Sequence, residues 1–433
     1  MQADENILIL SGVRGDTRRY RTLHLCEQLR LAGLSPVLTH LTDPHLLPLA
    51  SSARIAVLHR VAYDRTVEKL LAMLRRQGAL IVLDADDFLY DPAAMRWIDS
   101  PDFQDPVRAA IYRRELLRHR ATLEHCDAIT VSTGYLAGLL SPFGKPVIVH
   151  RNAYSLEMLA HSQQAVQARP ANSDRVVIGY ASGTRTHDND LAMIRPVLRA
   201  ILERYPQVEL RLLGAVEPDQ DWGGLQARVS PYPLVPWRNL PDRLAHLDIN
   251  LAPLLPDSPF NQAKSEIKYM EAALVRVPTV ATPTDAFAHA IRSGHNGLLA
   301  DTPADWQASL ERLVENAEVR RAMGECAYQA VMEHYAPHVR GQQAVENLAN
   351  LSQQLGKGLP ELNQAPPLSE PAHLPAVPFS PVDESHPTHL DLAFYSIRNR
   401  GLPILAGQVW VYFRRLAAPI FPFRRKGVND DRS

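Results

Sequence analysis

Short apolar segments alternate with longer amphipathic segments along most of this chain, and this alternation constrains the fold more than any other feature. In the first 150 residues, helices are expected at residues 66–77 and 107–125. The predicted strands are residues 7–10, 37–41, 55–58, 80–83, 128–132 and 146–149. Strands separated by helices of this length form right-handed βαβ units, so the pattern predicts an α/β fold with a parallel sheet covered on both faces.

The alternation resumes after a polar segment at residues 160–175. A chain of 433 residues is long enough to bury two domain cores and still carry an appendage. We therefore expect two Rossmann-like, doubly wound domains, at residues 1–155 and 170–354. In the second domain the predicted strands are 176–179, 208–213, 249–251, 279–281 and 297–300, and the predicted helices are 191–204, 241–247 and 265–275.

The charge balance and the cysteine content exclude several classes of protein. Lys and Arg total 46 against 47 Asp and Glu, so no overall field attracts nucleic acid. The three cysteines lie far apart and form neither a disulfide framework nor a metal-ligand cluster. The N-terminal MQADENILIL is unlike a signal peptide, and no uncharged apolar stretch approaches about 18 residues. We expect a cytoplasmic protein that is soluble or attached to the inner face of the cell membrane.

The composition changes after the second predicted domain. Residues 355–389 are rich in proline with little apolar periodicity, which is typical of an extended linker. The tail, residues 390–433, mixes aromatic side chains with arginines, as in QVWVYFRRLAAPIFPFRRKG. Such a tail can lie on an anionic bilayer with its aromatic side chains inserted. The alternative is a segment that packs back onto the body of the protein or onto a partner.

Charged residues cluster in the stretch FNQAKSEIKYMEAALVRVPTVATP, residues 260–283. On a helix, Lys264, Lys268 and Glu271 would share one stripe, with Ser265 capping its start. The adjoining apolar stripe comprises Ile267, Met270 and Leu274. Two lysines near a helix N-terminus suit an anion such as a diphosphate, and the carboxylate could accept bonds from sugar hydroxyls. The alternative is a solvated face with ion pairs between successive turns.

Features around this stretch resemble a known family. Glu271 lies seven residues before Pro278, and the segment GHNGLL follows at residues 294–299. From about residue 176 to residue 350 the chain resembles the nucleotide-binding half of GT-B glycosyltransferases, in particular the retaining, family 4-like glycosyl transferases group 1 of polysaccharide biosynthesis. The resemblance implies the GT-B fold, in which the two domains face a cleft. It also implies that Glu271 holds the ribose of the donor nucleotide and that Lys268 matches a lysine of many members.

Two positions depart from the family pattern. Many members carry a second glutamate eight residues before the first, where this chain has Ala263 beside Lys264. The small residue before the proline, usually glycine, is Val277. These departures bear on how the sugar ring is held more than on nucleotide binding.

A second donor-side element is the sequence Ser-Gly-Thr at residues 182–184, between a predicted strand and a predicted helix. Backbone N–H groups in such a turn can approach phosphate oxygens, and Gly183 lacks the Cβ that would block that approach. The turn alone is a common one. In GT-B enzymes the first loop of the C-terminal domain contacts the donor diphosphate, so the resemblance implies donor contacts for Gly183, Thr184, Arg185 and His187.

Trp237 ends the segment LVPW, which resembles the part of the family whose backbone lies against the nucleobase. The alternative is that its indole belongs to the core.

Three aspartates follow a predicted strand of the first domain, in the segment IVLDADDF. Ligands of open α/β sheets bind at this carboxyl edge. An Asp-x-Asp that binds a metal is typical of GT-A enzymes, which lack a second domain. Haloacid dehalogenase-type phosphatases use a nucleophilic aspartate here, but they need a downstream acidic pair for Mg²⁺ that is not evident. The third interpretation places Asp84 and Asp86 in the interdomain cleft near the acceptor.

Adjacent carboxylates repel, so at least one of them should pair with a base such as Arg60 or Arg21. For Asp87, loop capping and solvation are the simpler interpretation. His59 and Arg60 close the preceding predicted strand and are expected to point to the cleft, although a lone histidine at a strand end is more often structural. The catalytic candidates on the acceptor side are His59, Asp84 and Asp86.

These features predict a glycosyltransferase that moves a hexose from a nucleotide diphosphate sugar to a glycan or lipid-linked saccharide in cell-envelope polysaccharide synthesis. Lysine, arginine and helix N-terminal amides can stabilise the leaving diphosphate, so no metal or other cofactor is expected. A nucleotide-sugar epimerase and a non-catalytic GT-B-like nucleotide-binding module remain alternatives. An NAD enzyme is disfavoured because no G-x-G-x-x-G follows the first strand of either half.

Overall fold

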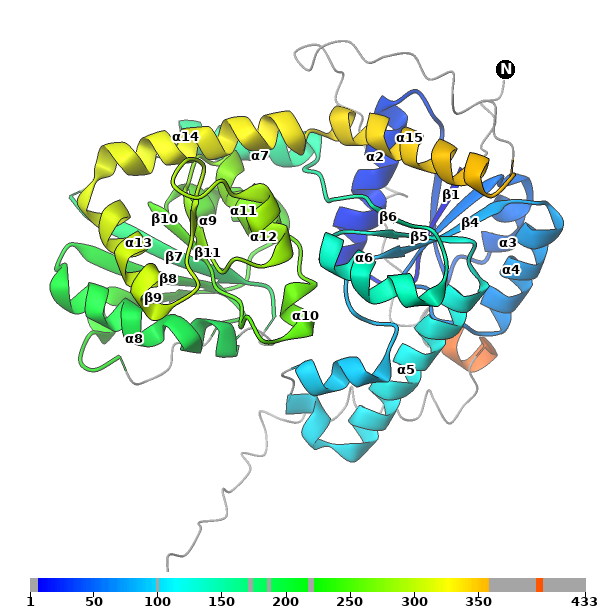
Figure 1. Ribbon diagram of the computed structural model, residues 1–433, viewed down its shortest axis with the longest axis horizontal. Helices are drawn as coiled ribbons and strands as arrows, with labels where there is room; N and C mark the ends of the chain where they lie inside the picture. Colours follow the sequence, from blue (N-terminus) through cyan, green and yellow to red (C-terminus); the bar gives the residue numbers. More distant parts are fainter. Residues whose placement is uncertain are drawn as a thin grey trace, which may run out of the picture.

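The computed structural model describes residues 7–98, 101–169, 174–184, 188–216, 222–357 and 395–399. These residues form two α/β domains, each built on a twisted parallel sheet with helices on both faces (Figure 1). The predicted fold class is confirmed in both halves of the chain.

The sheet of the N-terminal domain has six strands in the order β2-β1-β3-β4-β5-β6. Every neighbouring pair is parallel, as the sequence pattern predicted. The strand order reverses between β1 and β3, which is where open α/β sheets bind ligands. The strands are β1 (Ile7–Ser11), β2 (Val37–His40), β3 (Ile55–His59), β4 (Leu80–Ala85), β5 (Ala128–Val131) and β6 (Val147–Val149).

The sheet of the C-terminal domain has the order β12-β11-β10-β7-β8-β9 and is also parallel. The sequence did not predict β9, because Pro231 within it argues against a strand; at the edge of a sheet a proline is tolerated. The strands are β7 (Val176–Ser182), β8 (Val208–Gly214), β9 (Val229–Tyr232), β10 (Ile249–Ala252), β11 (Thr279–Ala281) and β12 (Leu298–Leu299).

The helices predicted at residues 66–77, 107–125, 191–204 and 241–247 agree within three residues at each end with α4, α5, α8 and α9, and most of the other helices were not predicted. In the N-terminal half they are α1 (Asp16–Arg18), α2 (His24–Leu31), α3 (Leu46–Leu49), α4 (Arg65–Arg76), α5 (Pro106–His125) and α6 (Gly134–Leu140). The remaining helices are α7 (Leu156–Gln167), α8 (Asp188–Arg204), α9 (Leu240–Ala245), α10 (Pro259–Gln262), α11 (Ile267–Leu274), α12 (Asp285–Ala290), α13 (Pro303–Glu315), α14 (Ala317–His334) and α15 (Pro337–Gln354).

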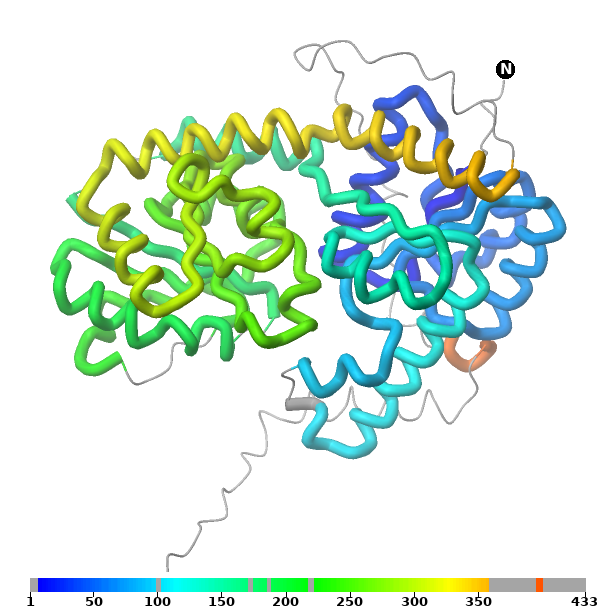
Figure 2. The backbone as a smooth tube through the Cα atoms, in the orientation of Figure 1, coloured from blue at the N-terminus to red at the C-terminus, as the bar shows by residue number. Residues whose placement is uncertain are grey.

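The chain crosses between the domains twice, which the predicted boundaries did not anticipate. The segment read as a polar break contains α7, whose Ser155 cap accepts a hydrogen bond from the Met158 amide, and α7 packs against α9 and α11 of the C-terminal domain. At the other end, α14 runs along the C-terminal domain and α15 returns to α2 (Figure 2). Ala344, Leu348 and Leu351 of α15 belong to the apolar core of the N-terminal domain.

Most of the predicted linker and tail, residues 358–394 and 400–433, lies outside the described residues. Residues 395–399 form a short helix that packs on the N-terminal domain. The Tyr395 hydroxyl donates a 2.8 Å hydrogen bond to Oδ2 of Asp64, and Thr66 and Asn399 are joined at 2.7 Å. Within the described ranges, no helix has the length and apolar character needed to span a membrane.

Candidate active site

A cavity of about 350 Å³ lies between the two domains, where the carboxyl ends of both sheets meet. This volume lies within the usual range for a small-molecule site. The N-terminal domain contributes Asp16, Thr17, Arg19, Tyr20, Arg21, Arg60, Asp86, Asp87 and Asn152 to its wall. The C-terminal domain contributes Lys264, Ser265, Ile267, Lys268 and Glu271, the loop 181–184, and apolar side chains that include Leu213, Leu234, Val235 and Trp237.

The helix predicted at residues 265–275 is broken into two. The first piece, α10, ends at Gln262, and α11 begins at Ile267, so Lys264 lies in the turn between them. The predicted cap is wrong: Ser265 makes no capping bond, and its Oγ instead accepts from Asn152 Nδ2 at 3.0 Å. Nevertheless Lys264, Lys268 and Glu271 all line the cavity, so the prediction that they face one ligand space agrees with their positions.

Lys268 is a buried cation at the cavity wall. Its Nζ is buried and has no hydrogen-bond partner among the described residues. The ammonium lies 4.3 Å from the centroid of the Tyr180 ring, which offers only a cation–π contact. Burial lowers the pKa of Lys268 to about 8, against the opposing effect of Asp190 and Glu271. A buried cation without a partner favours an anionic ligand in the adjoining cavity.

Glu271 is held from the opposite domain. The hydroxyl of Tyr20, in the π-helical turn η1 (Arg19–Leu23), donates a hydrogen bond to Oε1 of Glu271. Burial raises the pKa of Glu271 above its usual value, while Tyr20 and Arg19 act in the opposite direction. The bond fixes one carboxylate oxygen and leaves the other able to accept from a ligand hydroxyl.

The loop after β7 forms the floor of the cavity beside Lys268. Ser182 Oγ donates to the carbonyl of Thr184 at 2.7 Å, which shapes the turn. Apart from its chain neighbours, no heavy atom of the described residues lies within 4 Å of the place that a Cβ on Gly183 would take, so on that side the described part of the chain leaves the backbone open to a ligand. At Gly214, with φ of 90°, a Cβ would lie 2.2 Å from the Ser182 carbonyl oxygen, so β8 and this loop approach closely only with glycine. The other two predicted donor contacts, Arg185 and His187, lie outside the described residues.

Trp237 belongs partly to the apolar core and partly to the cavity wall. It is half-buried and packs against the cluster that contains Leu254 and Phe287, and it also lines the cavity. The guanidinium of Arg19 lies 4.6 Å from the centroid of the Trp237 ring and 4.3 Å from that of Tyr20. Together with Leu234 and Val235, the indole makes one end of the cavity apolar.

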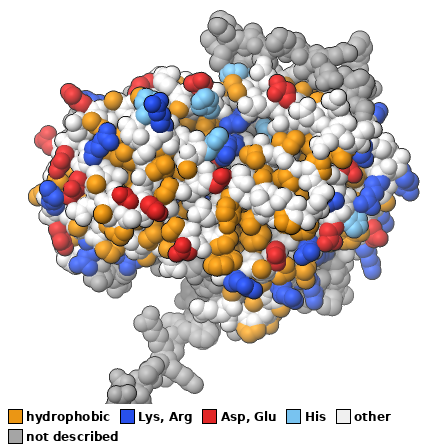
Figure 3. Space-filling view, in the orientation of Figure 1, with side chains coloured by type: hydrophobic (Ala, Val, Ile, Leu, Met, Phe, Trp, Pro, Cys, Tyr) orange, Lys and Arg blue, Asp and Glu red, His pale blue; other side chains and the backbone are white. Residues whose placement is uncertain are grey.

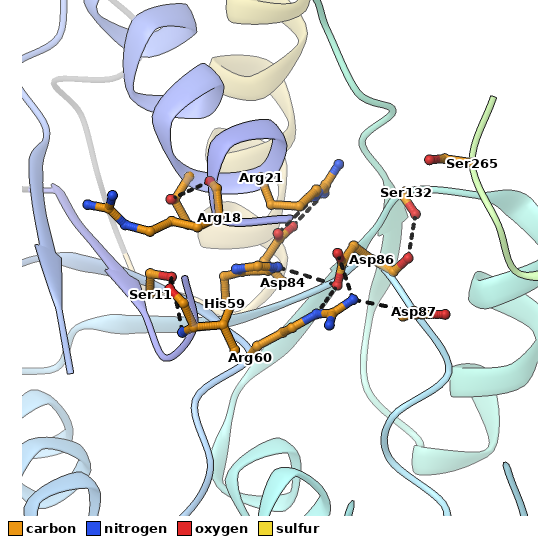
Figure 4. Close-up of polar contacts among 12 residues, drawn as sticks. Ser11, Arg18, Arg21, His59, Arg60, Asp84, Asp86, Asp87, Ser132 and Ser265 are labelled. Carbon is orange, nitrogen blue, oxygen red and sulfur yellow. Dashed lines mark hydrogen bonds and ion pairs between the residues drawn. The ribbon is translucent and has the colours of Figure 1, made fainter. Parts of the chain in front are cut away.

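In the N-terminal domain, Asp84 is engaged in a buried ion pair (Figure 4). Arg21 donates to its two oxygens at 2.9 and 2.6 Å, and Thr130 donates to Oδ1 at 2.8 Å. Arg21 also donates to the side chain of Asn152 at 3.0 Å. The predicted pairing with Arg21 is confirmed. Asp84 is 1% exposed and does not line the cavity. Its carboxylate fixes the position of Arg21, which does line the cavity, and is not accessible to act as a nucleophile.

Asp86 lines the cavity and is held by Arg60, as expected. Arg60 donates to the two oxygens of Asp86 at 2.7 and 3.0 Å. Burial alone would raise the pKa of Asp86, but Arg60 and His59 together lower it well below its usual value. His59 itself lies 3.3 Å from Asp86 and is fully buried, so the expectation that it points into the cleft is wrong. It lies behind the cavity wall, because β3 is covered on both faces.

Asp87 joins the two domains. Lys264 Nζ lies 2.9 Å from its Oδ2, and Arg60 lies 3.3 Å from the same oxygen. Asp87 also caps its own loop, since the Phe88 amide donates to its Oδ1 at 3.2 Å. The interpretation of capping and solvation was therefore incomplete.

Position 263, where many members of the family carry a glutamate, is occupied by alanine and lies away from the cavity. It is fully buried within the core cluster of the N-terminal domain, and it does not line the cavity. Its carbonyl oxygen accepts from Thr133 at 3.4 Å. In this molecule position 263 belongs to the contact between the domains and has no access to a ligand.

The sequence did not identify Tyr20, Arg19 or Asp16 as cavity residues, although all three line it. They follow the loop after β1 in the segment GDTRRYR. A tyrosine among arginines directly after the first strand of an α/β domain is the signal that could have located them. Within the described part of the chain, no group of three or more His, Cys, Asp or Glu side chains is placed to hold a metal ion.

The architecture and the interdomain cavity define the GT-B fold of glycosyltransferases. Residues 175–316 match the family described as Glycosyl transferases group 1. A comparison of the sequence with curated proteins gives no significant match.

Three solved structures illustrate the likeness. The chain is 14% identical to Anabaena HepE in complex with UDP and glucose, over 79% of this chain and 99% of that chain, with a TM-score of 0.52. It is 14% identical to the sucrose-phosphate synthase of Thermosynechococcus elongatus, over 81% and 99%, with a TM-score of 0.53. A glycosyltransferase from Rickettsia africae is 10% identical over 82% and 100%, with a TM-score of 0.54. At these identities the likeness shows the fold alone.

Proposed function

We propose that this protein is a glycosyltransferase that moves a hexose from a nucleotide diphosphate sugar to a hydroxyl of a glycan or a lipid-linked saccharide in cell-envelope polysaccharide synthesis. The observation that carries the proposal is the buried Nζ of Lys268, which has no hydrogen-bond partner among the described residues, at the wall of a cavity that also holds an oriented carboxylate, Glu271.

The cavity offers a separate environment for each part of such a donor. Its apolar end at Leu234, Val235 and Trp237 suits a nucleobase, and Glu271 suits the ribose hydroxyls. The diphosphate would lie between Lys268 and the open backbone at Gly183. The binding of UDP and glucose by HepE, a protein of the same fold, makes UDP the first nucleotide to test.

The reaction proposed here proceeds without a metal and with retention of configuration, as the resemblance of the sequence implies for stereochemistry. Lys268, Lys264 and backbone amides would stabilise the negative charge that develops on the leaving diphosphate. The acceptor would enter from the N-terminal side, where the carboxylates of Asp86 and Asp87 can accept bonds from sugar hydroxyls.

The experiment is a thermal-shift and calorimetric screen against UDP, GDP, ADP, CMP and their sugars. A nucleotide at 100 times its Kd should stabilise the fold by about 2.7 kcal/mol. Lys268→Ala and Glu271→Ala should lose this shift, while Lys69→Ala and Glu68→Ala on exposed α4 should retain it. If no nucleotide stabilises the protein, the donor site is wrong; if the cavity variants respond like wild type, the site is misplaced.

Product analysis separates the remaining alternatives. A transferase consumes donor in proportion to an added saccharide acceptor, whereas an epimerase changes the donor without any acceptor. A binding module gives the thermal shift and no reaction. Activity that survives EDTA would support the metal-free reaction, and loss of activity restored by Mg²⁺ or Mn²⁺ would contradict it.

A further inference from the structure

Exposed apolar side chains gather on one side of the N-terminal domain. Six large apolar residues of the described chain are at least about a third exposed, and four of them lie on three segments of the N-terminal domain: the turn that ends at Trp97, α5 and the helix at residues 395–399. These four are Trp97 (42%), Val107 (50%), Leu117 (42%) and Ile397 (40%). Hydrophobic side chains bordered by Lys and Arg cover the lower part of this domain in Figure 3, where Figure 1 shows α5 and the turns before it.

The exposed residues of α5 form one stripe of the helix. At about 100° per residue, Val107, Ala110, Arg113, Arg114 and Leu117 fall within an arc of roughly 120°. All five are exposed, and we call them the α5 face. On the opposite side of the helix, the buried Leu116 and Leu123 already fix α5 to the domain. The apolar residues of the α5 face are therefore not required for packing within the chain.

The charges on this face are cationic and uncompensated. Arg113 lies at one edge of the stripe and Arg114 lies within it, between Ala110 and Val107, and neither arginine has an ion-pair partner within the described ranges. The glutamates of α5 are used elsewhere: Glu115 pairs with Arg118 at 3.2 Å and Glu124 with Arg120 at 3.1 Å. Arginines flanking an apolar centre suit a lipid surface, where the stems lie along the acyl boundary and the guanidinium groups reach the phosphates.

The helix at residues 395–399 extends this face. The Tyr395 hydroxyl lies 2.8 Å from Oδ2 of Asp64, and Arg118 of α5 lies 3.9 Å from the same oxygen, so the helix sits beside the middle of α5. It exposes Ile397 and Arg398. In the sequence, residues 400–433 follow this helix and contain seven Lys or Arg, two Asp and several aromatic residues. Their composition is therefore cationic and apolar, like that of the α5 face.

We propose that the α5 face, together with the helix at residues 395–399, is a docking surface for an anionic lipid membrane. The proposal does not depend on glycosyl transfer. The surface lies near the boundary between the two domains, because Ser258 Oγ, which caps α10 of the C-terminal domain, donates to the Trp97 carbonyl oxygen at 3.4 Å.

The test is flotation of the full chain with vesicles of phosphatidylcholine alone or with 30% phosphatidylglycerol. The wild type should float with the anionic vesicles only. Each arginine near an anionic surface contributes roughly fivefold, so Arg113→Glu with Arg114→Glu should lower the partition coefficient by about 25-fold or more. Val107→Asp with Leu117→Asp should also lower it, because insertion of the apolar centre is lost.

The matched control reverses two exposed arginines of the C-terminal domain, Arg312→Glu with Arg321→Glu, which changes the net charge equally. This variant should float like wild type. An unchanged melting temperature of the Arg113/Arg114 variant shows that it is folded, so the test stands even if the aspartate variant unfolds. The proposal is overturned if the wild type does not float, if the α5 variants float like wild type, or if the control loses binding equally.

Discussion

The hydroxyl of Tyr20, in the N-terminal domain, donates a hydrogen bond to Oε1 of Glu271 in the C-terminal domain. The two residues are 251 positions apart in the sequence, yet they meet at the wall of one cavity. The carboxylate proposed to hold the donor ribose is therefore oriented by the other domain.

This contact predicts that Tyr20→Phe weakens nucleotide binding about fivefold, since one hydrogen bond that orients the carboxylate contributes roughly 1 kcal/mol. Glu271→Ala should cost more, about 1.5–3 kcal/mol, because bonds to a charged group are lost. Calorimetry of both variants and of the double variant measures the coupling. Tighter binding by Tyr20→Phe would mean instead that Tyr20 competes with the ribose.

Lys268 predicts a pH dependence of donor affinity. Its pKa is lowered to about 8 by burial, so the free protein loses the ammonium as the pH rises through 8. The affinity for a nucleotide diphosphate sugar should be constant between pH 6.5 and 7.5 and should fall above pH 8, by at most tenfold per pH unit. Lys268→Arg, which keeps its charge, should bind with the same affinity from pH 7 to 9. A wild-type profile as flat as that of the arginine variant would contradict the assignment.

The ion pair between Lys264 and Asp87 predicts that Asp87→Ala strengthens donor binding and weakens acceptor binding. Asp87→Ala leaves the Lys264 ammonium uncompensated, so a diphosphate donor should bind a few-fold more tightly. Removal of a carboxylate on the acceptor side should at the same time raise the KM for the acceptor. Donor affinity from calorimetry and acceptor KM from initial rates distinguish this outcome from general unfolding, which would weaken both.

Ala263 predicts that restoring the acidic residue of the family pattern is harmful here. Ala263→Glu places a carboxylate in a fully buried position among apolar side chains of the N-terminal domain core. The free energy of unfolding should fall by about 3 kcal/mol or more, without a gain in transfer rate. Ala263→Ser, which is smaller and uncharged, is the control and should be milder. A stable, more active glutamate variant would show that the side chain reaches the cavity.

The raised pKa of Glu27 predicts how the free energy of unfolding depends on pH. Burial raises its pKa to about 8, while the Leu156 amide, which donates to its Oε1 at 3.1 Å, acts in the opposite direction. Between pH 4.5 and 8 the folded state keeps a proton that the unfolded state has lost, so this group makes the protein less stable as the pH rises, by at most about 1.4 kcal/mol per pH unit. Glu27→Gln should remove this slope in urea unfolding at pH 5, 6.5 and 8. Parallel slopes for the two proteins would contradict it.

Local patterns in the sequence were sufficient to predict every strand of the two sheets except β9. The strands β1, β3 and β4 were predicted almost to the residue, because strands buried on both faces are continuous apolar runs. The loop at Gly183 and the residues Lys268 and Glu271 were also located correctly at the cavity, since the carboxyl ends of parallel strands and their adjoining helices share one edge.

Other features depend on contacts between distant parts of the chain. The break between α10 and α11, the return of α15 to the N-terminal domain and the burial of His59 follow from packing that no local pattern encodes. The contacts of Glu271 with Tyr20 and of Lys264 with Asp87 likewise depend on how the two domains pack against each other.

The sequence by itself determined all strands except β9, several of the longer helices and the chemical types of side chain at the strand ends, because periodicity and turn residues act over a few positions. The tertiary structure decided which charges are compensated and which face a ligand. Arg21 and Asp84 neutralise each other in the core, whereas Nζ of Lys268 has no hydrogen-bond partner beside the cavity in the part of the chain that the structure describes. Such a distinction depends on distances of a few ångströms between segments far apart in the chain, since electrostatic interactions in a buried site vary steeply with separation and exposure.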